Sequence, residues 1–227
     1  MRRLRIPQNL TSLAHRHIRN YILEGHLDAG GRLTEEYLSQ QLGISKSPIR
    51  EALNRLEAEG LIRIEPRRGA HLRLYSESEI SDLYDFREAL EAHAVLVARL
   101  TPELLQSLRH SVEVHKQHHR AEEKERYIEE DTRFHSMLAQ ATGNQHLVRA
   151  LANLQDQLSI LRRKTYDLSS SRAVPMHARI VDCLAKEDRQ AAAEAMREHI
   201  RSTRDKLIEH VTQASPGSAS RYGRMKA

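Results

Sequence analysis

The sequence predicts a mainly α-helical protein, in which an N-terminal winged helix-turn-helix precedes an all-helical bundle of six or seven helices. The segment from Thr34 to Gly69 has the order helix, tight turn, helix and hairpin, and apolar residues recur at helical spacing through most of the remaining chain. Strand and turn signals largely vanish after Tyr75. We therefore expect one domain over residues 1–75, a second over 76–213 and a disordered tail over 214–227.

The helix-turn-helix begins with a short helix, and a support helix over about residues 9–24 precedes it. Leu38 and Leu42 give the short helix an apolar face, and Gly43 is the residue type suited to the tight turn that ends it. Ser45 is suited to cap the second helix. Pro48 falls in the first turn of that helix, where a missing N–H costs nothing.

The N-terminal end of the second helix is polar. It carries the hydroxyls of Ser45 and Ser47 and the cations of Lys46 and Arg50. A recognition helix meets the major groove and its flanking phosphates with this end. We therefore predict that these four residues contact double-stranded DNA.

A β-hairpin is predicted after the second helix. Residues 61–64 are expected to form a short strand, residues 66–69 a turn and residues 71–74 the returning strand. The turn carries Arg67, Arg68 and Gly69, and adjacent cations suit a contact with the DNA backbone. This hairpin would be the wing, and its turn completes the predicted DNA contacts.

The net charge of the chain is concentrated in the first domain. Residues 1–75 contain 13 basic and 8 acidic residues, whereas residues 76–227 contain 23 of each. This distribution indicates nucleic-acid binding by the first domain and argues against a polyanionic partner for the second. The single cysteine, Cys183, excludes an internal disulfide framework. No segment approaches the roughly 20 apolar residues that span a bilayer, so we expect a cytoplasmic protein without a membrane partner.

Helices of the second domain are expected at regular intervals. Ser76 is suited to cap the first, and Pro102 lies in the first turn of the next. Further helices are predicted over about residues 126–141, 145–164, 171–186 and 188–211. A loop rich in serine, Ser169–Ser171, is expected to separate the second and third of these four.

Histidine is unusually frequent, with 14 in the chain. One group of four lies in a polar stretch that continues into a run of charged residues, and it comprises His110, His115, His118 and His119. We expect these side chains on a solvated helix face and not in a metal site.

A second group of residues has the composition of a metal site. Asp131 and His135 are four residues apart on one predicted helix, so their side chains emerge on the same face. His177 and His199 lie on two later helices of the same bundle. Three imidazoles and one carboxylate are a sufficient first shell for a borderline divalent ion and leave positions open for another ligand. Spacing alone leaves open the alternative that these are hydrogen-bonded core histidines.

The first domain resembles a known family. The run GISKSPIREALNRLEAEGLI, followed by RRGAHL, is similar to the DNA-binding domain of the GntR superfamily of bacterial transcription regulators. The usual form at this turn is Ser-Arg-Thr-Pro-Val-Arg-Glu-Ala-Leu, and Lys46 and Ser47 stand here in place of the usual Arg and Thr. Both keep a cation and a hydroxyl, but Lys lacks the flat bidentate contact that Arg makes with guanine.

The second domain resembles the FCD ligand-binding domain of the FadR-type branch of that superfamily. In that family an Asp, a His four residues later and two His on the last two helices hold a metal at the base of an effector cavity. The resemblance places Asp131 and His135 in DTRFHSMLAQATGN, His177 in HARIVDCLAKEDRQAA and His199 in AMREHI at those positions. It does not decide between six helices, as in the VanR-like subgroup, and seven.

The resemblance also implies a role for Arg87, in DFREALE, because it occupies the place of a family arginine near the cavity. The alternative is an ordinary ion pair with Glu91 on the helix surface. Where Arg87 and an open metal position share one cavity, a small carboxylic acid fits as effector. Zinc is the expected metal, although nickel or manganese would accept the same ligands.

The sequence therefore predicts a homodimeric transcription regulator, a repressor and not an enzyme, that binds a palindromic operator under the control of a small organic acid. One alternative is a metal-dependent hydrolase fused to a DNA-binding module, since such a metal could also activate water. No carboxylate is placed by spacing as its general base. A second alternative makes the helical domain a dimerisation device with buried histidines.

Overall fold

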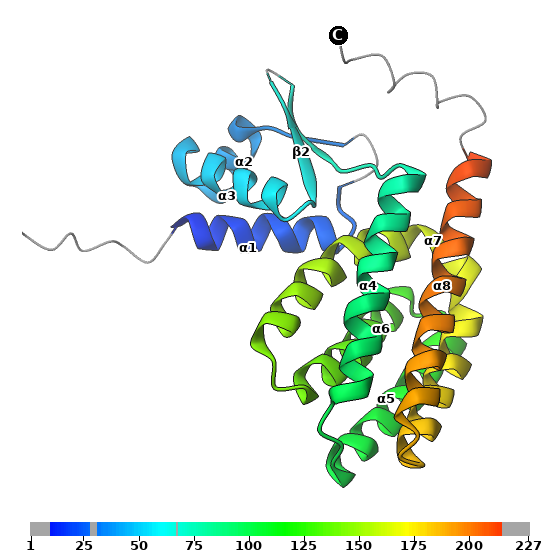
Figure 1. The fold of residues 1–227 in the computed structure, drawn as a ribbon. Coiled ribbons are helices and arrows are strands. Elements are labelled where there is room, and N and C mark those ends of the chain that lie inside the picture. The colour runs from blue at the N-terminus through cyan, green and yellow to red at the C-terminus, as the bar shows by residue number, and fades with distance from the viewer. Residues whose placement is uncertain (1–9, 28–30, 67, 215–227) are drawn as a thin grey trace, which may run out of the picture. The chain divides into compact units, whose positions relative to one another are not determined.

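A computed structural model describes residues 10–27, 31–66 and 68–214 of the chain (Figure 1). It divides into two compact units between Leu74 and Tyr75. None of the described helices combines the length and the apolar character needed to cross a membrane. The predicted tail beyond Ala214 and the predicted DNA contact Arg67 lie outside the described residues.

The first unit contains three helices and a three-stranded sheet in its described residues. In chain order these elements are α1 (Leu10–Leu23), β1 (Arg32–Leu33), α2 (Glu35–Leu42), α3 (Lys46–Ala58), β2 (Ile62–Glu65) and β3 (Gly69–Leu72). The strands are antiparallel in the order β1-β3-β2, so β1 adds to the predicted hairpin a third strand that the sequence did not indicate. The helix-turn-helix and the hairpin form as predicted.

The turn between α2 and α3 has the predicted chemistry. Gly43 has φ +65°, and its N–H donates to the carbonyl of Ser39 at 3.0 Å, so the residue ends α2 in the left-handed region. Thr34 caps the other end of α2 by accepting from the N–H of Tyr37. Ser45 has the extended backbone of an N-cap, but its side chain makes no capping hydrogen bond.

Helix α3 packs on α1, on α2 and on strand β2, so it lies at the centre of the core of this unit. The buried apolar residues on the helices and strands are Ala14, Ile18, Ile22, Leu33, Leu38, Ile49, Ala52, Leu53, Leu56, Ile62, Ala70 and Leu72. The spacing of these residues on α3 is the helical spacing that the sequence showed. The core therefore fixes the outward face of α3, which carries the predicted DNA contacts.

Gly69 is required by its surroundings in the sheet. Its φ is +87°, and a Cβ atom at this position would lie 2.8 Å from the carbonyl oxygen of Leu33 on the neighbouring strand β1. Both the backbone conformation and the close approach exclude a side chain. The geometry of the wing therefore explains why residue 69 is a glycine, independently of any DNA contact.

The second unit is a helical bundle with five helices among its described residues. They are α4 (Glu77–Val97), α5 (Pro102–Arg120), α6 (Lys124–Ala141), α7 (Gln145–Ala185) and α8 (Arg189–Ala214). Ser76 caps α4 in a reciprocal capping box with Glu79, and Thr101 caps α5, of which Pro102 is the first residue. Figure 1 shows α4 and α8 running side by side, and α8 also packs along α7.

The serine-rich break predicted at Ser169–Ser171 is absent. Helix α7 continues through it and even contains Pro175, so two predicted helices form one and the described bundle has fewer helices than expected. The reason is tertiary packing. Leu161, Tyr166, Ala173 and Val174, on both sides of the serines, are buried in the core of the bundle. Their burial outweighs the low helix propensity of serine and proline.

Candidate metal and effector site, and candidate DNA-binding surface

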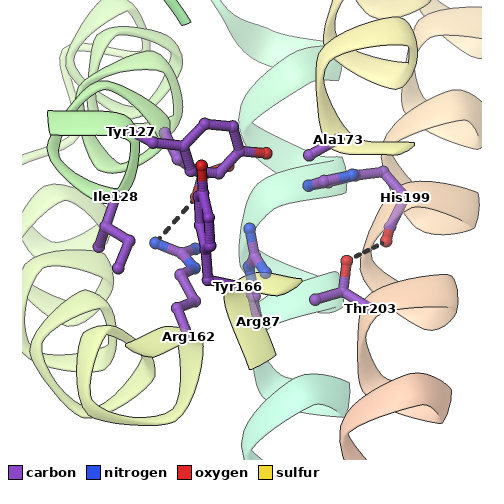
Figure 2. A pocket seen from close by; sticks show the side chains of 9 residues that line it. Arg87, Tyr127, Ile128, Arg162, Tyr166, Ala173, His199 and Thr203 are labelled. Carbon is purple, nitrogen blue, oxygen red and sulfur yellow. Dashed lines mark hydrogen bonds and ion pairs between the residues drawn. The ribbon is translucent and has the colours of Figure 1, made fainter. Parts of the chain in front are cut away.

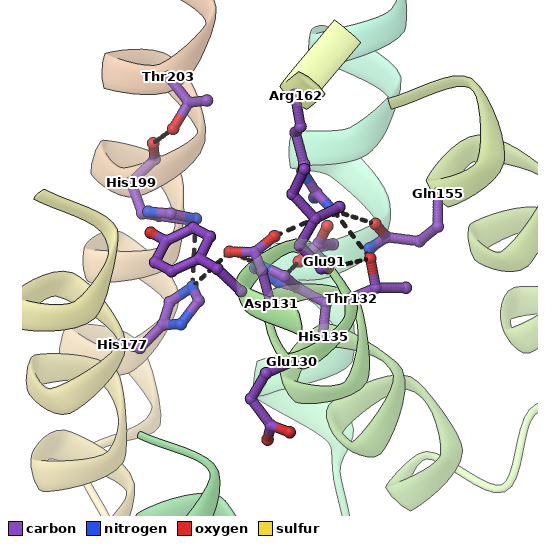
Figure 3. Close-up of polar contacts among 12 residues, drawn as sticks. Glu91, Glu130, Asp131, Thr132, His135, Gln155, Arg162, His177, His199 and Thr203 are labelled. Carbon is purple, nitrogen blue, oxygen red and sulfur yellow. Dashed lines mark hydrogen bonds and ion pairs between the residues drawn. The ribbon is translucent and has the colours of Figure 1, made fainter. Parts of the chain in front are cut away.

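The four predicted metal ligands meet in the interior of the bundle. Asp131 and His135 lie one turn apart on α6, His177 lies on α7 and His199 on α8, and all four are buried (Figure 3). One donor atom from each lies within 4.8 Å of the others. The Nε2 atom of His177 lies 3.4 Å from Nε2 of His199 and 3.6 Å from Oδ1 of Asp131. Three helices thus deliver three imidazoles and one carboxylate to one point.

This group of donor atoms fits a divalent ion. Zinc bonds of about 2.0–2.1 Å to nitrogen or oxygen place neighbouring ligand atoms about 3.3 Å apart. The Nε2 atom of His135 and Oδ1 of Asp131 are 3.9 Å apart, so small inward shifts would complete the shell. Three neutral nitrogen donors and one carboxylate suit zinc, nickel or manganese.

Packing holds the ring of His177 in place. Phe134 on α6 stacks on it, with ring centres 4.1 Å apart and planes inclined by only 7°. The ring of His199 stands nearly edge-on to the same imidazole, with centres 4.7 Å apart. The two histidines therefore reach the site from α7 and α8 in fixed orientations.

Two buried residues on α4 contact His135. The carboxylate of Glu91 contacts Nδ1 of the ring, and Arg87 donates from Nη2 to Nε2 at 2.9 Å. Arg87 also donates from Nε to Glu91 at 2.7 Å. A carboxylate on the far nitrogen is the usual support for a metal-binding histidine, because it orients the ring and raises its basicity. In this arrangement the lone pair at Nε2 of His135 accepts the hydrogen bond from Arg87. A metal ion bound to Nε2 would use that lone pair, so Nη2 of Arg87 would be free to donate elsewhere.

Arg87 forms an ion pair with Glu91 and also lies at the cavity. Its ion pair with Glu91 exists, but it is buried and not on the helix surface, since the side chains are only 1% and 2% exposed. Arg87 also lines the cavity beside Asp131 and His199. Its effector contact stays a prediction.

A second buried arginine, Arg162 on α7, holds the carboxylate of Asp131. Its Nη1 atom lies 2.9 Å from Oδ2 of Asp131 and also donates to Gln155 and Thr132 (Figure 3). Its Nη2 atom is buried and has no hydrogen-bond partner among the described residues. The sequence did not indicate Arg162, because the helical spacing of apolar residues does not show which of the adjacent Arg162 and Arg163 points into the bundle.

The electrostatics of the site favour neutral forms of His177 and His199 and charged forms of Glu91 and Asp131. Burial, together with the neighbouring histidines, holds the pKa values of His177 and His199 well below the usual value. Burial would raise the pKa of Glu91, but Arg87 and His135 outweigh it and lower that pKa to about 2. Burial likewise opposes ionisation of Asp131, but Arg162 and the histidines hold its pKa well below the usual value. Neutral His177 and His199 and a charged Asp131 are the protonation states in which these three predicted ligands can bind a metal.

A small cavity adjoins two of the predicted ligands, Asp131 and His199, and Figure 2 shows the side chains that line it. Residues of α4, α6, α7 and α8 line it: Arg87, Tyr127, Ile128, Asp131, Arg162, Tyr166, Ala173, His199 and Thr203. Its volume is about 20 Å³, which is room for about one water molecule. An organic acid therefore enters only if side chains or helices of the wall move.

One histidine of α5 contradicts the predicted solvated face. His115 is 1% exposed, with its ring packed 3.9 Å from that of Tyr127 and 5.2 Å from that of His177. His110 is exposed as expected, and His118 and His119 are partly exposed. Because the sequence around His115 is polar, it gave no sign that this side chain lies on the buried face of α5. That face also carries Leu108, Ser111 and Val112.

The predicted DNA contacts of the first unit share one surface. Ser45, Lys46, Ser47 and Arg50 are exposed at the N-terminal end of α3, and Arg68 is exposed beside the wing turn. Arg50 donates from Nε and Nη2 to Glu35 of α2 at 2.8 Å each, and Lys46 pairs with Glu36. Exposed ion pairs contribute only about 0–1 kcal/mol. Phosphates can therefore replace these carboxylates at little cost.

Comparison with known proteins agrees with this architecture. A family model described as the FCD domain matches residues 82–202, and one described as bacterial regulatory proteins, gntR family, matches residues 10–72. The HTH-type transcriptional regulator YdhC of Bacillus subtilis (strain 168) is 28% identical over 187 residues, which cover 80% of this chain and 84% of the relative. A probable D-xylose utilization operon transcriptional repressor of Paenarthrobacter nicotinovorans is 29% identical over 79% of this chain and 80% of its own.

A solved structure shares the fold. That of Escherichia coli McbR/YncC superposes with a TM-score of 0.76 and 21% identity, over 89% of this chain and 98% of the other. The winged helix-turn-helix and the helical unit correspond to the two matched family models, and together they define a DNA-binding transcriptional regulator. The chain belongs to the GntR family of these regulators, with a C-terminal FCD domain. The relatives are regulators and not enzymes, so the hydrolase alternative is not favoured.

Proposed function

We propose that this regulator binds an inverted-repeat operator as a homodimer and represses transcription, and that a small organic acid bound beside a divalent metal controls its DNA binding. The observation that carries the metal part is the meeting of Asp131, His135, His177 and His199 from three helices at one buried point. The metal would supply a Lewis-acidic position for an oxygen of the effector. Zinc is the expected ion.

Charge balance supports an anionic effector. The site contains two buried arginines, Arg87 and Arg162, and two buried carboxylates, Glu91 and Asp131, so it is neutral when the histidines are neutral. A divalent ion adds two positive charges in a region closed to water. Burying an unbalanced charge is costly, so an acid with two negative charges would restore neutrality.

The donors available in the cavity fit that acid. Arg162 has a buried Nη2 atom without a partner among the described residues. Nη2 of Arg87 would become available as a second donor once Nε2 of His135 binds a metal. One carboxylate would complete the metal shell, and the guanidinium groups would bind the remaining oxygens. Because the cavity has room for about one water molecule, such a ligand must shift the wall formed by α6, α7 and α8.

This shift is how the effector would act on DNA binding. A ligand changes a conformational equilibrium only by its differential affinity for the two states. An acid that fits only the expanded cavity has such a difference, and it would favour one arrangement of the bundle and, through the dimer, one spacing of the recognition helices. The repressor assignment is supported by the name of the Paenarthrobacter nicotinovorans relative.

The DNA-binding part of the proposal rests on the exposed cationic end of α3 and the wing. Ser45, Lys46, Ser47 and Arg50 would meet the major groove, and Arg68 the backbone. Arg67 would join Arg68 in that contact, and Gly69, which follows them at the start of β3, would shape the wing. A single helix-turn-helix reads few base pairs, so a two-fold dimer on two half-sites is expected.

Three linked measurements test the proposal. Selection from random duplex DNA with the full chain should yield an inverted repeat, and light scattering should show a dimer. On that DNA, zinc-loaded protein should change its affinity with one or more dicarboxylates of a panel and less with the matching monocarboxylates. A single unrepeated site, or a response that is the same without metal, would contradict the proposal.

A further inference from the structure

The support of the four ligand residues is uneven, and His177 is the one that stands out. When a neutral histidine binds a metal through Nε2, its Nδ1 carries the proton and must donate it. His135 has the carboxylate of Glu91 at its Nδ1 atom. Nδ1 of His177 is buried and has no hydrogen-bond partner among the residues that the structure describes.

His115 is the polar side chain that faces this unsupported ring. It is 1% exposed, and neither of its ring nitrogens has a hydrogen-bond partner within the described part of the chain. Its ring lies nearly parallel to that of His177, with planes inclined by 25° and centres 5.2 Å apart. Two neighbouring buried imidazoles with unused nitrogens are an unusual arrangement, because buried polar groups are nearly always hydrogen-bonded.

The surroundings hold His115 beside His177. Its other side packs on the ring of Tyr127, whose hydroxyl donates to the carbonyl of Ser170 on α7 at 2.9 Å. One turn earlier on α5, the buried Ser111 donates to Glu130 of α6. These contacts tie α5 to α6 and α7 at the level of the site, so the position of His115 is fixed by the fold.

We infer that His115 is a positioning residue for the metal: it accepts the Nδ1 proton of His177, after a small rotation of its ring or through one water, and so holds His177 in the metal-binding tautomer. This inference rests on the proposed metal site. A neutral imidazole has one N–H and one lone pair, so the unused ring nitrogens of His115 include an acceptor for this proton. A merely structural histidine would gain nothing from burial without a partner.

The test compares zinc affinity among four forms of the full chain, measured by competition with a chromophoric chelator at pH 7. His115→Phe keeps an aromatic ring against Tyr127 and removes the acceptor, so it should bind zinc about 10–100-fold more weakly, as expected when an outer-shell partner is lost. His115→Gln keeps a hydrogen-bonding group and should recover most of the affinity. His110→Phe, an exposed change on the same helix, should bind as the parent does.

Stability of the metal-free proteins separates positioning from packing. The metal-free His115→Phe protein should melt no lower than the parent, because the substitution removes a buried imidazole that lacks partners. If phenylalanine prevents folding, His115→Leu takes its place in the same comparison. Equal zinc affinity in the parent and the folded apolar variant, or failure of His115→Gln to recover affinity, would overturn the inference. A parent that binds no zinc would overturn the proposed metal site itself.

Discussion

Arg162 Nη1 lies 2.9 Å from Oδ2 of Asp131, so the carboxylate is held from one side while Oδ1 faces the histidines. Both side chains are buried, at 9% and 7% exposure. Oδ2 of Asp131 thus binds Arg162, and Oδ1 is available to a metal. The pair also keeps the carboxylate charged in the interior, because Arg162 outweighs the effect of burial on its pKa.

Breaking this pair should cost the metal-free protein more stability than the metal-loaded protein. Arg162→Met leaves Asp131 as an uncompensated buried charge, which costs about 3–5 kcal/mol of unfolding free energy. Zinc would replace the lost positive charge, so zinc should raise the melting temperature of the variant more than that of the parent. Thermal unfolding with and without zinc measures both.

The neighbouring Arg163 provides the matched control. Its ion pair with Glu125 is at the surface, where the acid is 60% exposed, so Arg163→Met should cost less than about 1 kcal/mol and leave the zinc effect unchanged. Equal losses in the two variants would show that Arg162 has no special relationship to the site.

The metal-free protein should lose stability as the pH falls from 7 to 5. Burial lowers the pKa values of His115, His177 and His199 in the folded state, whereas the unfolded chain binds these protons near pH 6.5. The contribution of these histidines is therefore fully present above pH 6.5 and decreases below it, by up to about 1.4 kcal/mol per pH unit for each. The folded-state pKa values of Glu91 and Asp131 are lowered, so their contribution to stability stays constant from pH 7 to pH 5 and is lost only below about pH 4.5.

Melting temperatures in a chelating buffer would follow this dependence, and His115→Phe should reduce its slope by removing one of the three protons. A parent protein whose melting temperature is unchanged between pH 7 and pH 5 would show that these histidines are not held neutral.

Arg50 should be essential for specific DNA binding. It lies at the exposed N-terminal end of α3, where only a surface pair with Glu35 has to be exchanged for DNA. Arg50→Ala should nearly abolish binding to the selected operator, and Arg68→Ala should weaken it with a shallower dependence on salt, as a phosphate contact would. Fluorescence anisotropy at several salt concentrations measures both effects.

Arg55 is the control for that experiment, since it is exposed near the C-terminal end of the same helix. Arg55→Ala should bind the operator as the parent does. If Arg50→Ala kept parental affinity with its helical content intact, the proposed docking of α3 would be wrong.

The sequence predicted those parts of the molecule that local patterns determine. Gly43 and Pro48 fixed the positions of the turn and of the second helix, and the spacing of Asp131 and His135 on α6 placed two ligands on one face. The continuity of α7 across Ser170 was missed, because long-range burial outweighs local propensity there.

Contacts between distant helices explain the remaining differences. The inward turn of Arg162 and the burial of His115 depend on which face of α7 or α5 meets α6, and a polar stretch of sequence gives no sign of that. The pair of Arg87 with Glu91 was considered from its spacing, but its burial and its contact with His135 follow only from the packing of α4 on α6.

The most direct test of the central claim is the amount of zinc that stays bound to each chain. Metal-free protein would be incubated with zinc, desalted and measured by elemental analysis, with operator binding as the check on folding. The parent and His93→Ala, which changes an exposed histidine of α4, should each retain one zinc per chain. His177→Ala should retain none and still bind the operator. A parent without zinc, or a His177→Ala protein with as much zinc as the parent, would contradict the account.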